Sequence, residues 1–149
     1  MKKKVVFGVI GVFLAMTAVL AVIHQMTRTE EVEGAVLVEF AGQSVAVQIE
    51  DMPLSVVKGT VVNGKGDMRE IDAQGILLAD VLTLAGVENM PESGVLVTAA
   101  DEYSVEVTAD ELAEEDKVYL LQEETPRLLV FGDNSEKRNV KNVARITVQ

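Results

Sequence analysis

An uninterrupted apolar run near the N-terminus constrains this chain of 149 residues more than any other feature. Residues 5–23 contain one clearly polar side chain, Thr17, and three lysines at residues 2–4 precede them. A helix of this length spans roughly 28 Å at about 1.5 Å per residue, close to the thickness of a bilayer's hydrocarbon core. Because short positively charged flanks remain in the cytoplasm, we expect a single-pass cell-membrane protein whose C-terminal domain lies outside the cytoplasm.

A cleaved signal peptide is the alternative interpretation of the same run, because Val19 and Ala21 are small enough to precede a cleavage site. We favour an uncleaved anchor, since the apolar run continues through Val22 and Ile23. The predicted organisation is then cytoplasmic lysines at 1–4, a transmembrane anchor at 5–23, a tether at 24–34 and one extracytoplasmic domain at 35–149.

The composition removes several classes of chemistry. The chain has no cysteine and a single histidine, His24, which lies where the predicted membrane helix would end. Thiolate nucleophiles, disulfides, Cys-ligated zinc, His-dependent triads and multi-His metal sites are therefore excluded. No serine lies in a recognisable nucleophile motif. We accordingly predict no catalytic residue and no metal ligand, and we expect a binding role rather than an enzyme.

The charge of the chain is strongly negative and unevenly distributed. Residues 30–149 carry 24 acids and 9 bases, so we expect no nucleic acid, itself a polyanion, as a partner. Residues 101–124 contain ten acids and only Lys117 as a base, whereas residues 127–149 contain five bases and two acids. The acidic segment could dock on a basic envelope protein, and the basic segment could hold an anion.

Alternating apolar residues predict strands throughout the outer domain. A period of two marks residues 36–40 and 45–49 as a hairpin, and residues 56–62 end at a turn rich in glycine, 63–66. Further strands are predicted at 68–71, 95–99, 103–107, 118–122, 128–131 and 143–148.

Two short helices are also predicted. Helical spacing places five apolar residues of the segment 77–85 on one face, with Gly86 positioned to end the helix. Thr108 and Glu111 have the spacing of a capping box and begin a short acidic helix. Together with the strands, these helices predict a strand-dominated, mixed α+β domain.

Three closely spaced cations define the candidate site. The segment 131–141 joins a turn around Gly132 to Lys137, Arg138, Asn139 and Lys141. An arginine supplies a planar fork of donors and a lysine a point charge, which suits phosphate or carboxylate. The alternative is that these cations only balance the acidic segment before them and keep an edge strand soluble.

The chain resembles the molybdopterin-binding domain of the sulfite oxidase family over residues 36–149. The resemblance rests on the segment 75–87, with Asp80 and an Ala-Gly-Val ending, on Asp101-Glu102-Tyr103, and on Arg138-Asn139-Val140-Lys141 before a last strand. It implies a sulfite-oxidase-like fold with a pterin pocket, in which Arg138, Asn139 and Lys141 hold the phosphate of the cofactor.

The resemblance also implies a molybdenum ligand that this chain lacks. Catalytic members bind the metal through a cysteine in the segment that corresponds to residues 60–63, and the chain contains no cysteine. Ligation of molybdenum by cysteine is therefore excluded, and whether the domain binds molybdopterin or another cofactor stays unknown.

Three functions remain. The first is a non-catalytic binding or accessory domain for an anionic small molecule or a partner. The second is an oxidoreductase subunit that retains a redox cofactor without a cysteine ligand. The third is a structural envelope protein that docks through residues 101–124.

Overall fold

The computed structural model describes residues 34–149, which belong to one compact unit. Among these residues no helix is long and apolar enough to span a membrane. The predicted transmembrane anchor at 5–23, and the tether except Gly34, lie outside the described residues.

Nine strands, two α-helices and one 3-10 turn make up the described domain. The strands are β1 (Ala35–Phe40), β2 (Gln43–Gln48), β3 (Ser55–Val62), β4 (Met68–Leu77), β5 (Val95–Ala99), β6 (Ser104–Val107), β7 (Val118–Gln122), β8 (Arg127–Val130) and β9 (Val143–Val148). The helices are α2 (Leu78–Ala85) and α3 (Ala109–Ala113), and the 3-10 turn is η1 (Ile49–Asp51).

The domain is mostly β, and the predicted α+β class is wrong. Strands contain 47% of the described residues, and the two α-helices together with the 3-10 turn contain 14%. The two α-helices are where the sequence places them, but with eight and five residues they are too short to form a layer of their own. The strands instead form two sheets, whose association depends on contacts between distant segments that a local pattern does not encode.

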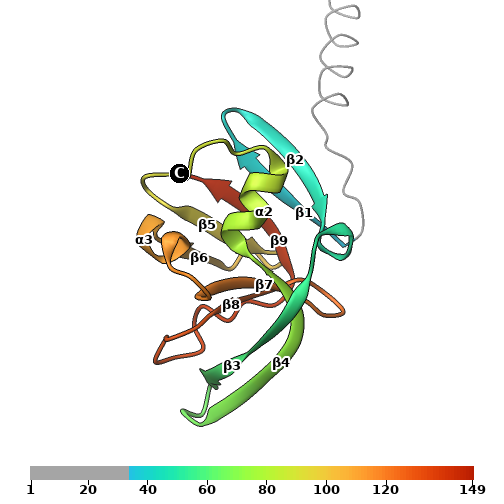
Figure 1. Ribbon diagram of the computed structural model, residues 1–149. Helices are drawn as coiled ribbons and strands as arrows, with labels where there is room; N and C mark the ends of the chain where they lie inside the picture. The colour runs from blue at the N-terminus through green and yellow to red at the C-terminus, as the bar shows by residue number, and fades with distance from the viewer. Residues whose placement is uncertain (1–33) are drawn as a thin grey trace, which may run out of the picture. The chain divides into compact units, whose positions relative to one another are not determined.

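The first sheet has five strands in the order β2-β1-β9-β5-β6. Its pairs are antiparallel except β1 with β9, where Val38 lies opposite Ile146 in a parallel register. The second sheet has four antiparallel strands in the order β3-β4-β7-β8. Figure 1 shows β3 and β4 of this sheet as a long, bent hairpin that extends away from the rest of the domain.

The main core consists of apolar residues from the first sheet, from one face of the second sheet and from the buried side of α2. Its fully buried members include Val36, Val38, Leu82, Leu120 and Ile146. Each such aliphatic side chain contributes about 1.5–3 kcal/mol when it leaves water. The strands are therefore held together chiefly by burial of Val, Leu and Ile.

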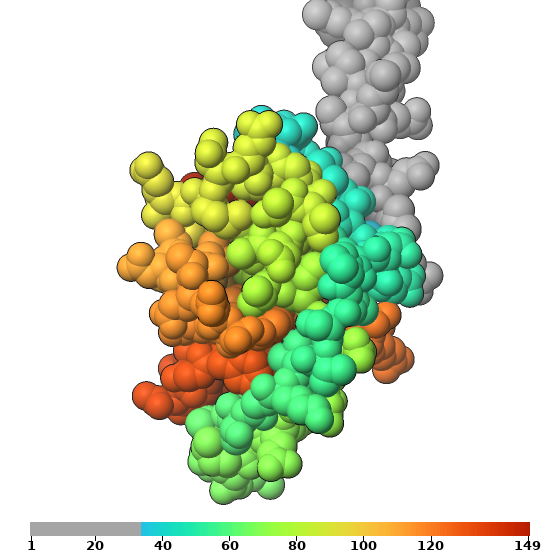
Figure 2. All heavy atoms as spheres, in the orientation of Figure 1, coloured from blue at the N-terminus to red at the C-terminus, as the bar shows by residue number. Residues whose placement is uncertain are grey.

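The other face of the second sheet buries a smaller cluster because this sheet curls on itself. Residues of β3, β4, β7 and β8 form the cluster, and Phe131 packs against it. A Cβ atom added to Gly59 of β3 would lie 2.5 Å from the Phe131 ring, which follows β8 at the opposite edge. In Figure 2 the β3–β4 hairpin forms the lower end of the visible face, below α2.

Local sequence signals set the ends of both helices, as predicted. Gly86 follows α2 in the left-handed region with φ 105°, which glycine adopts at low cost. The Thr108 hydroxyl accepts a hydrogen bond from the Glu111 N–H, and the Glu111 carboxylate accepts one from the Thr108 N–H. This reciprocal capping box begins α3 and fixes the position of Glu111.

Candidate functional site

Arg138 lies in the loop between β8 and β9, residues 131–142, and its guanidinium is fully engaged by the protein. Nε and Nη2 donate to the two carboxylate oxygens of Asp133 at 2.8 and 2.5 Å. Nη1 and Nη2 donate to the two oxygens of Glu111, both at 2.7 Å. The fifth donor, on Nη1, reaches the backbone carbonyl of Glu106 at 3.3 Å.

These hydrogen bonds give Arg138 a structural role in the domain. A guanidinium has five N–H donors, and here each has an acceptor within the domain. A phosphate or carboxylate at this position would have to displace Asp133 or Glu111. Arg138 therefore fastens the β8–β9 loop to α3 and β6, and the anion site predicted around it has to rely on its neighbours.

The charges of this network hold one another in the ionised form. Hydrogen bonding from Arg138 is the main cause that lowers the pKa of Glu111 to about 2, against an opposing effect of desolvation. The N–H of Thr108 also lowers this pKa. Hydrogen bonds to Asp133 and Glu111 raise the pKa of Arg138 above its ordinary value. Glu111 and Arg138 are consequently both charged at physiological pH.

The other three predicted residues line a hollow beside the same loop. The hollow measures about 520 Å³ and is bounded by the β8–β9 loop on one side and by the β5–β6 turn on the other. Its walls come from Lys137, Asn139 and Lys141, together with Asp101 and Tyr103 of the turn. We call this space the Tyr103 hollow. The structure thus brings Lys137, Asn139 and Lys141 together and places the head group of Arg138 on protein acceptors.

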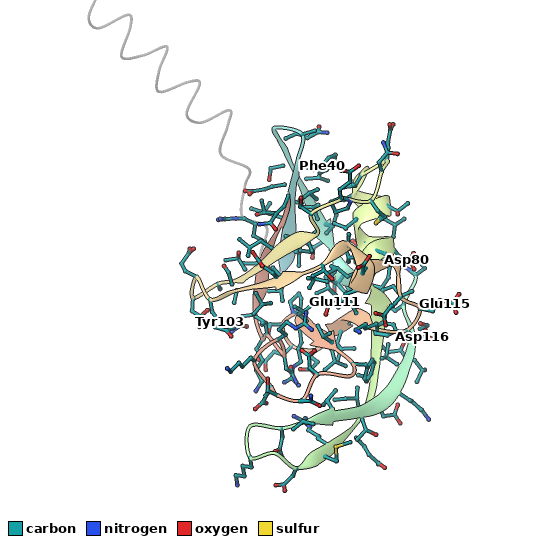
Figure 3. The ribbon with its side chains drawn as sticks, turned by 90° about the vertical axis from the view of Figure 1, so that its left-hand side faces the viewer. Phe40, Asp80, Tyr103, Glu111, Glu115 and Asp116 are labelled. Carbon is teal, nitrogen blue, oxygen red and sulfur yellow. The ribbon has the colours of Figure 1, made fainter. Side chains whose placement is uncertain are left out.

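A long-range hydrogen bond fixes the two walls relative to each other. The hydroxyl of Tyr103 donates to the backbone carbonyl of Lys137 at 2.8 Å, across 34 residues of sequence. The backbone N–H of Tyr103 donates to Asp101 Oδ1 at 3.1 Å, which closes the turn before β6. In Figure 3 Tyr103 lies on one side of the domain, and Asp80, Glu115 and Asp116 lie on the other.

Lys137 and Lys141 are the cationic side chains that line the hollow. Among residues 34–149, Lys137 and Lys141 take part in no ion pair. The two carboxylates at the rim have local contacts: Asp101 accepts from its own turn, and Glu136 Oε2 lies against Gly64 in the β3–β4 turn. The hollow is therefore lined by two lysines and two carboxylates, of which Asp101 accepts a hydrogen bond from its own turn.

Asn139 contributes an acceptor that the described protein leaves unused. Its side-chain Oδ1 is buried and accepts no hydrogen bond from residues 34–149, while its backbone N–H donates to the Glu136 carbonyl at 2.9 Å. A buried polar atom without a partner costs about 1–3 kcal/mol. Because Oδ1 is buried, a ligand in the hollow could reach it only after a rotation of the Asn139 side chain.

A second hollow of about 400 Å³ lies near the start of the domain. Its lining includes Gly34, Glu50, Glu123, Glu124 and Pro126, so its charge is negative. Within residues 34–149, no three acidic or histidine side chains are arranged to hold a metal ion. This hollow offers neither a free cation nor a metal-binding group, and the Tyr103 hollow is the better candidate site.

Sequence reasoning missed the contribution of the β5–β6 turn. Asp101 and Glu102 lie between the predicted strands 95–99 and 103–107, and the structure places them in the turn between β5 and β6. Nothing local indicated that Tyr103 contacts Lys137, because the two residues come together only through the pairing of β9 with β5.

Neither a family model nor a curated protein matches the chain. The resemblance to the sulfite oxidase family stays a prediction.

Proposed function

We propose that this protein is a membrane-anchored, extracytoplasmic binding module that holds a small anionic ligand in the Tyr103 hollow and catalyses no reaction. The observation that carries the proposal is the meeting of Lys137, Asn139 and Lys141 around one hollow of about 520 Å³. Hollows of this volume are typical of small-molecule sites.

The charge of the lysines supports an anionic ligand. Lys137 and Lys141 line the hollow and take part in no ion pair within residues 34–149. Charge-assisted hydrogen bonds from lysine to an anion are about twice as strong as neutral ones.

Binding of inorganic phosphate to the full-length protein tests the proposal. Isothermal titration calorimetry in detergent, at low salt and pH 7, should give saturable binding with a Kd of roughly 1 mM, the strength of about two charge-assisted hydrogen bonds. Lys141→Glu should weaken this binding at least about tenfold because it places a like charge in the hollow.

A matched control separates the hollow from the overall charge. Lys58→Glu changes the net charge by the same amount on the exposed outer face of β3, where Lys58 is 3.6 Å from Asp72. This variant should bind phosphate within about twofold of the unmodified protein, since exposed charges are screened over short distances. Equal weakening by both substitutions, or no binding at all, would refute the hollow as the site.

Elemental analysis and an absorption spectrum test the non-catalytic part of the proposal. Protein purified from its own host should be colourless and free of molybdenum. Stoichiometric molybdenum, or the spectrum of a redox cofactor, would support the oxidoreductase alternative instead.

A further inference from the structure

The Tyr103 hollow has an apolar part that a simple inorganic anion would leave unused. Tyr103, whose side chain is exposed, lines it together with Ala99 and Val140, which are almost completely buried. A phosphate ion is also much smaller than the space, whose volume is in the range of sites for complete organic ligands.

Tyr103 is unusual among the aromatic residues of the domain. Its side chain is 48% exposed, whereas Tyr119 is buried and Phe40 and Phe131 are partly buried. An exposed aromatic side chain normally samples several rotamers, but the hydrogen bond to the Lys137 carbonyl holds this ring at one position. A ring that is fixed and still accessible loses little further entropy when a ligand stacks on it.

Resting on the proposed function, we infer that the ligand is a planar aromatic or heteroaromatic anion, with its ring against Tyr103 and its charged group at Lys137 and Lys141. The exposed ring of Tyr103 accommodates the ring of the ligand, and the lysines accommodate a carboxylate or phosphate ester. Aromatic pairs are stabilised beyond simple burial, so the ring adds selectivity that the lysines alone do not provide.

Two phosphate monoesters of equal charge test this inference on the full-length protein. Phenyl phosphate should bind at least about fivefold more tightly than methyl phosphate in calorimetric titrations, because only the first can stack. Tyr103→Leu and Tyr103→Phe both remove the hydroxyl that bonds to the Lys137 carbonyl, so they should bind methyl phosphate within about twofold of each other. Tyr103→Phe keeps the ring and should retain part of the preference for phenyl phosphate, whereas Tyr103→Leu should lose most of it.

Tyrosine fluorescence provides an independent readout. The chain has two tyrosines and no tryptophan, so Tyr119→Phe leaves Tyr103 as the only fluorophore of its kind. Phenyl phosphate should quench the emission of this variant with the calorimetric Kd, and methyl phosphate should not. Circular dichroism of each Tyr103 variant checks that the domain is folded.

The outcomes separate the inference from the proposed function. If both esters bind equally, or if Tyr103→Leu retains the preference, the aromatic platform is refuted and the anion site stands. If neither ester binds, both proposals fail.

Discussion

Arg138 shows how one side chain can determine the conformation of a long loop. Its five donors connect Asp133 in its own loop with Glu111 of α3 and with the Glu106 carbonyl of β6. The loop that supplies Lys137, Asn139 and Lys141 is thereby fixed at Arg138, and the Tyr103 hydroxyl fixes it a second time at Lys137. Arg138 therefore acts on the hollow indirectly, because it positions the loop that lines the hollow.

Removal of Arg138 should destabilise the domain more than removal of an exposed cation. We expect Arg138→Ala to lower the free energy of unfolding by about 2–3 kcal/mol, because two partly buried carboxylates lose their partner. Lys58→Ala breaks only an exposed pair and should cost less than about 1 kcal/mol. Urea unfolding followed by circular dichroism measures both values, and similar losses would contradict the structural role.

The sequence predicted only part of the candidate site at the level of single residues. The cluster of cations after the turn at Gly132 predicts a site on this loop, and three of its four residues line one hollow. The role of Arg138 was not visible, because its partner Glu111 is 27 residues away. Whether a side chain contacts a ligand or another residue depends on such distant partners.

Elements whose signals are local were predicted correctly. The capping box of α3 and the glycine after α2 each involve residues within four positions of one another. The turn at 63–66 is likewise confirmed by the hydrogen bond from the Gly66 N–H to the Asn63 carbonyl. The parallel pairing of β1 with β9 and the curling of the second sheet join distant segments, and no periodicity predicts them.

Two glycines with nearly equal φ angles can test how closely two neighbouring elements pack, because only one of them lies against another element. Gly94 and Gly66 have φ angles of 85° and 86°. A Cβ at Gly94 would lie 2.1 Å from the Val107 carbonyl oxygen at the end of β6, whereas one at Gly66 would meet nothing within 4 Å. Gly66→Ala should therefore cost about 1 kcal/mol for the left-handed conformation alone.

Gly94→Ala should cost at least about 2 kcal/mol more than Gly66→Ala, because the backbone of β6 has to move away. Thermal unfolding and urea titration of the two variants give this difference directly. Equal costs would mean that the segment before β5 does not pack against β6 as closely as the structure indicates.

The charge of the whole molecule makes its stability depend on pH. The chain carries a formal net charge of −11, so protonation of acids first relieves repulsion as the pH falls. Glu111 acts in the opposite direction, because its carboxylate is needed by Arg138 and by the N-terminus of α3. The two effects can be separated by substitution of a single carboxylate.

Glu111 has a pKa of about 2 in the folded protein and an ordinary value of 4.5 when unfolded. Its contribution to stability is complete above about pH 4.5 and decreases as the pH falls towards 2, since the unfolded chain takes up the proton first. Glu111→Gln should therefore be less stable than the unmodified protein at pH 7. The difference between the two free energies of unfolding should shrink steadily between pH 4.5 and 2.

Glu115→Gln is the matched control, because Glu115 is exposed just beyond α3 and makes no hydrogen bond through its side chain within residues 34–149. Its stability should follow that of the unmodified protein across the whole range, within about 0.5 kcal/mol. Urea unfolding at pH 7, 5, 4, 3 and 2.5 compares the three proteins. If the curve for Glu111→Gln ran parallel to that of the unmodified protein, the ionised Glu111 would not stabilise the fold, and the assignment of Arg138 as the residue that positions the loop would fail with it.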